Sequence, residues 1–132
     1  MNTRLHYTTL WRALGLTWLF VISVLSVSAV DQPLDFDNAD KWLHWVTWML
    51  MMVWFGSAWV SAPKRCFIFL LVMGAALELL QGLLPWRFMD LYDLLANLAG
   101  LITGLLLLGT PAGKLLPYFD RVLVHRFNAP PA

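Results

Sequence analysis

Four apolar stretches, each close to the length that crosses a lipid bilayer, constrain the fold of this chain more than any other feature. An α-helix needs ~20 apolar residues to cross the hydrocarbon core, and an open chain can satisfy its backbone there only as helices. Prolines lie in the breaks between the stretches, where they are typical of stops and turns. The sequence therefore predicts an all-α, integral membrane protein, a bundle of four transmembrane helices over residues 13–30, 42–60, 66–84 and 91–109.

The composition excludes an ordinary water-soluble domain. Of the 132 residues, 60% are hydrophobic and only 13% are charged, whereas soluble domains carry roughly 45–50% apolar and about 25% charged residues. The net charge of +1 gives no reason to expect a nucleic-acid partner. A single cysteine, Cys66, excludes an intramolecular disulfide and a cysteine-only metal cluster.

The distribution of basic residues predicts the orientation of the bundle. Lysine and arginine concentrate on the cytoplasmic side of membrane proteins. Seven of the nine basic residues fall on one side of the stretches, whereas the acidic segment 31–40 and the turn 85–90 fall on the other. We therefore expect a cytoplasmic N-terminus over residues 1–12, a membrane domain over 13–109 and a cytoplasmic tail over 110–132. The basic residues on the cytoplasmic side are Arg4, Arg12, Lys64, Arg65, Lys114, Arg121 and Arg126.

Two segments keep a second interpretation. Arg4 and Arg12 before an apolar run, followed by Ser-Val-Ser-Ala at 26–29, resemble a secretory signal with a cleavage site. The length of the run and the bulky Trp18 favour a retained helix.

The tail is either partly ordered or a short helix on the inner membrane surface, whose basic residues face anionic headgroups. That helix would contain the apolar Leu115, Leu116, Phe119, Val122 and Leu123 and the basic Arg121, His125 and Arg126.

Polar residues of three stretches gather at the outer end. Ionisable groups within or beside membrane helices are costly, so each is a functional candidate. Spacings of three, four and seven residues place them on shared helix faces, and Glu78 sits ~10 Å along its helix from the outer turn. Because the inner halves of the last three stretches hold almost no charge, the pattern predicts one polar pocket open to the outer face. Its members are Asp40, Lys41, His44, Glu78, Gln81, Arg87, Asp90, Asp93 and Asn97.

Most of these residues also have a purely structural interpretation. The aspartates that begin helices suit caps, the lysine can extend its amine to the headgroups, and the histidine and the two amides suit hydrogen bonds between helices. Glu78 and Asp93 fit this least, because a carboxylate within a span needs a cation nearby to stay ionised. With His44 neutral the pocket has a net charge of −2, so it needs a protonated acid, a protonated histidine or a metal. A divalent cation suits the carboxylates, and its ligands would be His44, Glu78 and Asp93.

In order and spacing these residues resemble the VanZ-like family of membrane proteins. The matching pattern is D-K-x-x-H from Asp40, E-x-x-Q from Glu78, and R-x-x-D-x-x-D-x-x-x-N-x-x-G over 87–100, within residues 31–109. Trp48 departs from the pattern, since members often have Tyr there, and its indole lacks that hydroxyl. The resemblance implies a small multi-span protein of the bacterial cytoplasmic membrane, associated with the cell envelope and with glycopeptide (teicoplanin) resistance. It implies no agreed reaction.

Three functions are consistent with such a pocket, and we place binding ahead of catalysis. The first is binding or remodelling of a membrane lipid or lipid-linked envelope precursor, with Lys41 and Arg87 on its phosphate. The second is an enzyme that acts on a phosphate- or acyl-bearing head, with His44 as general acid or base and Glu78 or Asp93 orienting it or carrying the second proton. The third is a partner subunit of an envelope complex, whose polar set only locks the helices together. In the first two, the binding residues are Asp40, Lys41, Gln81, Arg87, Asp90 and Asn97.

Overall fold

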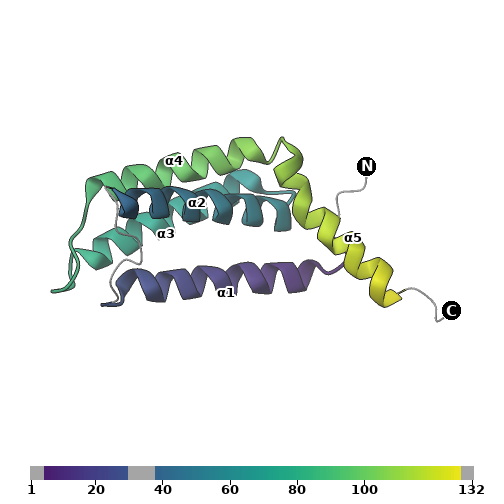
Figure 1. Cartoon of the computed structure of the whole chain (residues 1–132), viewed down its shortest axis with the longest axis horizontal. Coiled ribbons are helices and arrows are strands. Elements are labelled where there is room, and N and C mark those ends of the chain that lie inside the picture. The colour runs from purple at the N-terminus through teal and green to yellow at the C-terminus, as the bar shows by residue number, and fades with distance from the viewer. Residues whose placement is uncertain (1–4, 30–37, 129–132) are drawn as a thin grey trace.

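The described residues of the chain fold into helices, which confirms the all-α class. The computed structural model describes residues 5–29 and 38–128, so Arg4, the acidic segment 31–37 and the end of the first predicted stretch lie outside it. Four long helices lie side by side in alternating directions, and a fifth leaves the bundle at an angle at one end (Figure 1). The elements are α1 (Thr8–Val27), α2 (Ala39–Ala58), α3 (Pro63–Gln81), α4 (Leu91–Leu107), the short 3-10 helix η1 (Pro111–Lys114) and α5 (Leu115–Asn128).

Three of the helices begin earlier than the apolar stretches that predict them. α1 starts at Thr8, α2 at Ala39 and α3 at Pro63. Proline is tolerated in the first turn of a helix, because its missing N–H would have no intrahelical partner there. α3 therefore includes the basic pair that the sequence assigned to a break, and Asp40 and Lys41 belong to the first turn of α2.

Length and apolarity single out α1 as a candidate membrane span by itself. It has 20 residues, a mean hydropathy of 1.8 and only 17% of its most apolar stretch buried within the bundle. The 17-residue α4 qualifies only together with Pro111–Phe127, to which it is bent by 74°. α2 and α3 carry charged residues and, in α2, several tryptophans, which lower their mean hydropathy. A single helix of this kind also occurs in soluble cores and signal sequences, so the four-span arrangement stays a prediction.

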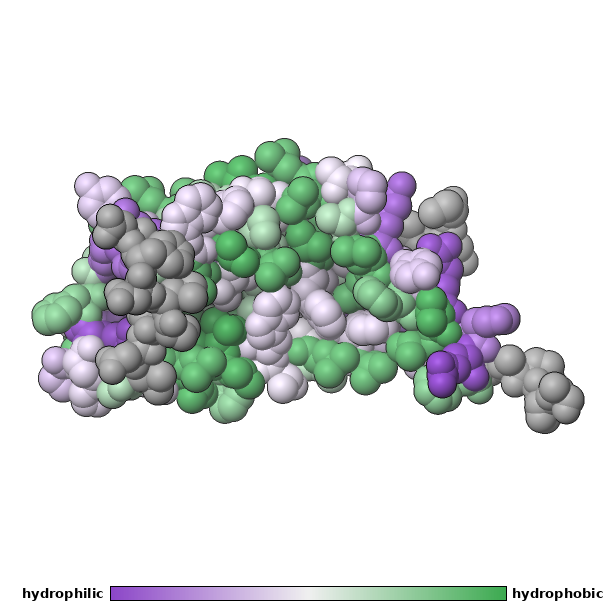
Figure 2. Space-filling view, viewed as in Figure 1, coloured by the Kyte–Doolittle hydropathy of each residue, from purple (hydrophilic) through white to green (hydrophobic). Residues whose placement is uncertain are grey.

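The exterior of the bundle is apolar around its middle. Phe20 of α1, Val72 of α3 and Leu106 of α4 are each more than 60% exposed, at 68%, 61% and 71%. Apolar side chains cover the middle of the visible face, and hydrophilic ones gather at the two ends (Figure 2). Large exposed apolar patches mark surfaces that contact a membrane or another protein.

α2 is the central helix of the core. Met51 and Met52 are almost completely buried, together with Leu70 of α3 and Leu101 of α4. Trp48, the aromatic residue that departs from the VanZ-like pattern, is also buried in this core. The core therefore lies between α2, α3 and α4, and partly buried residues of α1 pack against it.

α2 and α4 pack with their backbones almost in contact. A Cβ added at Gly100 would collide with the carbonyl oxygen of Trp45, and one at Gly104 would lie 2.5 Å from that of Met49. Only glycine fits at these two positions, and residues without a side chain at a spacing of four let two helices approach closely. The close approach brings the first turns of the two helices within reach of each other's side chains.

A buried carboxylate fastens α5 to the start of α1. Asp120 is 3% exposed and accepts hydrogen bonds from the backbone N–H of His6 (2.6 Å) and Tyr7 (2.9 Å) and from Nε1 of Trp11 (2.8 Å). His6 and Tyr7 immediately precede α1, so Asp120 holds the segment that leads into the helix, and Trp11 adds a contact from its first turn. Burial acts to raise the pKa of the Asp120 carboxyl, but these donors hold that pKa below its usual value. Residues 115–128 of the tail thus form the helix α5, and the position of this helix on the inner membrane surface stays a prediction.

Replacing Gly100 with Ala is expected to lower the free energy of unfolding by about 1–3 kcal/mol, because the added methyl group forces α2 away from α4. Gly109→Ala is the matched control, since a Cβ there meets its nearest atom, the carbonyl oxygen of Leu106, at an ordinary 3.5 Å. Thermal unfolding in detergent, followed by circular dichroism, measures both variants. Equal melting temperatures for the two would contradict the close packing.

Replacing Asp120 with Ala is expected to release the start of α1 from α5, because two N–H groups and one indole lose their acceptor. Since the pKa of Asp120 is lowered, its stabilisation is complete above the usual aspartate value and is lost as the pH falls through the lowered value. Hydrogen exchange of residues 6–11, corrected for the intrinsic rate at each pH, should be fast in the variant at neutral pH and in the wild type only in acid. Protected amides of residues 6–11 in the variant at neutral pH would show that Asp120 does not hold this segment.

Candidate functional site

The predicted polar residues meet at the end of the bundle opposite α5. The last turns of α1 and α3 and the first turns of α2 and α4 come together there (Figure 1). A pocket of about 430 Å³ opens between them. Lys41, Glu78 and Asn97 contact residues of its lining. The lining itself consists of Asn38, Ala39, Asp40, His44, Gln81, Trp86, Arg87, Phe88, Asp90 and Asp93.

Lys41 holds three aspartates at the junction of α2 and α4. Its Nζ lies 2.5 Å from Oδ2 of Asp40, 2.7 Å from Oδ2 of Asp90 and 3.1 Å from Oδ1 of Asp93. Asp90 also caps α4, because its side chain accepts from the backbone N–H of Tyr92 at 2.8 Å. The structural and the pocket interpretations of Asp90 therefore both apply, and the amine of Lys41 is engaged inside the protein.

The ion pairs around Lys41 change the pKa of this lysine and of two of its partners. The hydrogen bond from Lys41 lowers the pKa of the Asp40 and Asp90 carboxyls, and the bonds to Asp40 and Asp90 raise the pKa of the Lys41 amine. All three groups lie at the outer turn, before the apolar part of the predicted spans. Both carboxylates and the ammonium group are therefore charged at neutral pH, and the aspartates lose their contribution to stability as the pH falls through their lowered pKa values.

Asn97 connects His44 to Glu78 across three helices. Its Nδ2 lies 3.4 Å from Oε1 of Glu78, to which it donates, so its Oδ1 faces Nδ1 of His44 at 2.8 Å. An amide oxygen only accepts, so Nδ1 of His44 carries the hydrogen of this bond. Nε2 of His44 is then the nitrogen directed at Asp93, whose Oδ2 lies 3.7 Å away. Asn97 thus fixes which side of the imidazole is available for chemistry.

Among the described residues, one oxygen of Glu78 has no partner, whereas the corresponding oxygen of Asp93 has only an ion pair. Glu78 is 2% exposed, and its Oε2 has no hydrogen-bond partner within the part of the chain that the structure describes. Oδ1 of Asp93 is equally without a hydrogen bond there, although it forms the 3.1 Å ion pair with Lys41. A buried carboxylate oxygen without a partner is costly, because it loses its hydration and gains nothing in return.

Gln81 and Arg87 hold the last turn of α1. Nε2 of Gln81 donates to the carbonyl oxygen of Ser26 at 2.8 Å and lies 2.9 Å from its hydroxyl. Arg87 donates through Nε and Nη2 to the carbonyl oxygen of Ser28 at 3.2 and 2.9 Å. Sequence reasoning missed both serines as partners of the site, because it treated their segment only as a candidate cleavage site. It also did not foresee that Arg87 would bind a helix end.

The site can transfer a proton or bind a cation. His44 is 18% exposed in its side chain and borders the pocket, so Nε2 can exchange a proton with a bound molecule. A ring nitrogen of His44 and one oxygen each of Glu78 and Asp93 lie within 4.8 Å of one another. Asp40, Asp90 and Asp93 form a similar group, but the ammonium of Lys41 already lies among their oxygens. Of these two groups among the described residues, the first is therefore the candidate for a metal ion.

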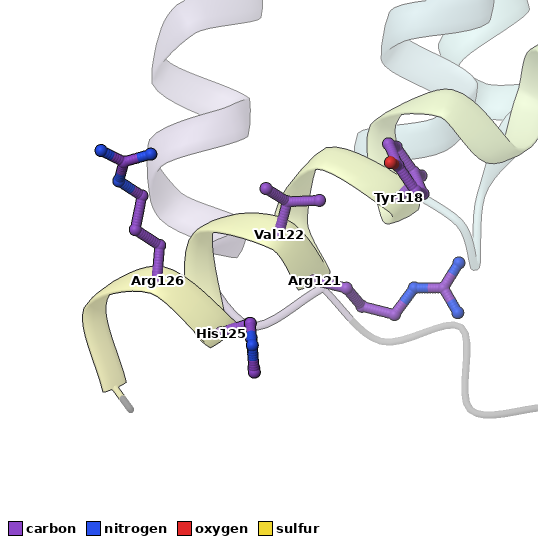
Figure 3. Close-up of a pocket in the computed structure, with 5 residues that line it drawn as sticks. All are labelled: Tyr118, Arg121, Val122, His125 and Arg126. Atoms are coloured by element: carbon purple, nitrogen blue, oxygen red, sulfur yellow. The ribbon is translucent and has the colours of Figure 1, made fainter. Parts of the chain in front are cut away.

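A second pocket, of about 570 Å³, lies on α5 at the opposite end. Its lining consists of Tyr118, Arg121, Val122, His125 and Arg126. The side chains of Arg121 and Arg126 extend in different directions from the helix (Figure 3). They do not converge on one point, so this pocket has no arrangement of cations around a single ligand.

No family model, curated protein or solved structure matches the chain. The resemblance to the VanZ-like family therefore rests on the residue pattern alone and stays a prediction. The geometry adds that seven residues of this pattern contact one another at one end of the bundle, namely Asp40, Lys41, His44, Glu78, Asp90, Asp93 and Asn97.

Proposed function

We propose that the chain is a VanZ-like membrane protein of the bacterial cell envelope, whose α1 to α4 cross the cytoplasmic membrane with both ends of the chain inside. The apolar middle of the bundle and its hydrophilic ends support this placement (Figure 2). In this proposal α1 is retained, an interpretation supported by the donors that Gln81, Trp86 and Arg87 provide to backbone oxygens of 26–28 at its end. If the family's association extends to this chain, its expression changes susceptibility to teicoplanin.

α5 lies on the cytoplasmic surface in this proposal. Leu116 faces inward and is buried against α1 and α2, whereas Phe119 and Phe127 are more than half exposed, at 53% and 70%. A helix with exposed aromatic residues and several basic ones suits the boundary between headgroups and acyl chains. Its Arg121, His125 and Arg126 would then meet anionic headgroups.

The pocket at the other end receives the polar head of a membrane lipid or a lipid-linked envelope precursor. One observation carries this proposal: the polar pocket has an exposed apolar rim. Phe88 and Trp86 line the pocket and are 88% and 53% exposed. A molecule with a polar head and an apolar chain can satisfy both surfaces at once.

Arg87 is the residue that contacts the phosphate of such a head. Lys41 is engaged by three aspartates, so it serves the site as a structural cation. Arg87 borders the pocket while two of its nitrogens hold Ser28. The planar guanidinium group matches the geometry of a phosphate bidentately, which makes Arg87 the cation of the pocket lining best suited to this contact.

Replacing Arg87 with Ala is expected to remove a co-purifying lipid, because the phosphate loses its charged contact. Native mass spectrometry of protein extracted gently from its own membrane measures the bound mass. Arg12→Ala is the matched control, since Arg12 also donates to a backbone oxygen of a neighbouring helix, that of Ala58, at the opposite end. Unchanged lipid retention in a folded Arg87→Ala variant would exclude the proposal.

A second candidate function is catalysis on the same head. It is favoured by the arrangement of His44, whose Nδ1 is held by Asn97 while Nε2 faces Asp93 and the pocket. An imidazole oriented in this way can act as a general acid or base, with Glu78 or Asp93 orienting it or carrying the second proton. A covalent serine or thiol route lacks its nucleophile, because neither residue type lines the pocket.

Replacing His44 with Gln is expected to abolish any turnover but to leave lipid retention in place, because glutamine keeps a polar contact without exchanging a proton. The purified protein is incubated with a bacterial total lipid extract, and lipid masses and released phosphate are followed over time. Turnover that survives in His44→Gln would exclude the catalytic role. A wild-type protein that retains lipid unchanged supports binding alone.

A further inference from the structure

We propose that His44, Glu78 and Asp93 form a binding site for one divalent transition-metal ion, Zn²⁺ or Mn²⁺. A ring nitrogen of His44 and one carboxylate oxygen from each of the acids lie within 4.8 Å of one another. Ligands about 2.1 Å from a tetrahedral ion are about 3.4 Å apart, so the three groups would have to move toward one another to coordinate it. The three residues come from α2, α3 and α4, so an ion there would join three helices.

The partnerless oxygen of Glu78 is independent support for this site. Glu78 is 2% exposed and its Oε1 accepts from Asn97, but Oε2 has no donor within the described part of the chain. A carboxylate oxygen held in this way among other polar groups has the coordination that a metal would complete.

Asn97 prepares His44 as a metal ligand. A ligating histidine commonly donates its second ring N–H to a carbonyl or carboxylate, which fixes the nitrogen that faces the metal. Nδ1 of His44 donates to Oδ1 of Asn97 at 2.8 Å, so Nε2 keeps its lone pair and faces Oδ2 of Asp93 at 3.7 Å. Oε1 of Glu78 lies 3.7 Å from Nδ1, on the other side of the ring, so a small rotation of the imidazole or of Glu78 would bring all three groups onto one ion.

The ligand types select the class of metal. Ca²⁺ and Mg²⁺ prefer all-oxygen sites, whereas one imidazole with two carboxylates suits ions that accept both nitrogen and oxygen. The charge agrees, because the four acids and two fixed cations of the pocket sum to −2. This sum already counts the ammonium of Lys41, which lies among the aspartates. A divalent ion would bring the net charge of the pocket to zero.

The site is reachable from the pocket and has an open side. Glu78 lies at its inner end, whereas the side chains of His44 and Asp93 are 18% and 13% exposed and border the pocket. Three protein ligands leave room for at least one further ligand on a metal ion. A phosphate oxygen of a bound lipid head would suit that position, a consequence that rests on the proposed function.

The test measures metal binding by the full-length protein in detergent without added lipid. Metal content after purification is determined by elemental mass spectrometry, and the chelated protein is titrated with Zn²⁺, Mn²⁺, Ca²⁺ and Mg²⁺ by calorimetry. The variants are Glu78→Gln and Asp93→Asn, which keep size and shape, and the control is Asp120→Asn, which alters a buried carboxylate at the other end. Circular dichroism checks that each variant keeps its helix content.

The expected result is about one equivalent of Zn²⁺ or Mn²⁺ in the wild type and in Asp120→Asn, with binding at least ~10-fold weaker in the two site variants. Absence of stoichiometric binding in the wild type would overturn the proposal, as would equal affinity in Glu78→Gln and Asp93→Asn or a preference for Ca²⁺ or Mg²⁺. The lipid measurement on Arg87→Ala is separate. If metal binding fails while lipid retention depends on Arg87, the metal site is wrong and the lipid proposal stands. If the reverse is found, the lipid proposal is wrong and the metal site stands.

Discussion

The backbone contact between α2 and α4 is the constraint on which the rest of the structure depends. Gly100 and Gly104 have no side chains to separate the two helices. The ion pair of Lys41 with Asp90 and the hydrogen bond of His44 with Asn97, at 2.7 and 2.8 Å, lie along the same seam. Side chains of ordinary length can make such contacts only when the helix axes are close. The polar site is therefore a product of apolar packing rather than an addition to it.

Much of the fold and of the site was predictable from local patterns. Apolar stretches of about one membrane thickness predict long helices, and polar residues three, four and seven positions apart predict the face on which they lie. A helix preserves such spacings whatever surrounds it. Helices of alternating direction also return to the same end at every second break, so the polar residues of 40–44, 78–81 and 87–97 had to meet at one end.

The partners of these residues were not predictable, because they depend on contacts between distant parts of the chain. Ser26 and Ser28 contribute backbone oxygens to Gln81 and Arg87, and backbone atoms leave no trace in a residue pattern. Asp120 was equally hidden, since one acidic residue in a mixed tail looks like a solvated charge. Three helices begin before the predicted apolar stretches for a local reason. Proline and polar residues occupy their first turns, and a search for apolar residues does not include such turns.

The Asp120 contact has a consequence for the order in which the chain can complete its structure. Asp120 lies 114 positions from His6, so a ribosome makes α1 long before it makes the carboxylate that holds the residues leading into it. Until α5 docks, the N–H groups of His6 and Tyr7 must bond to water or to another protein. The entry to α1 is thus completed by α5, and removing α5 would leave that entry without its acceptor.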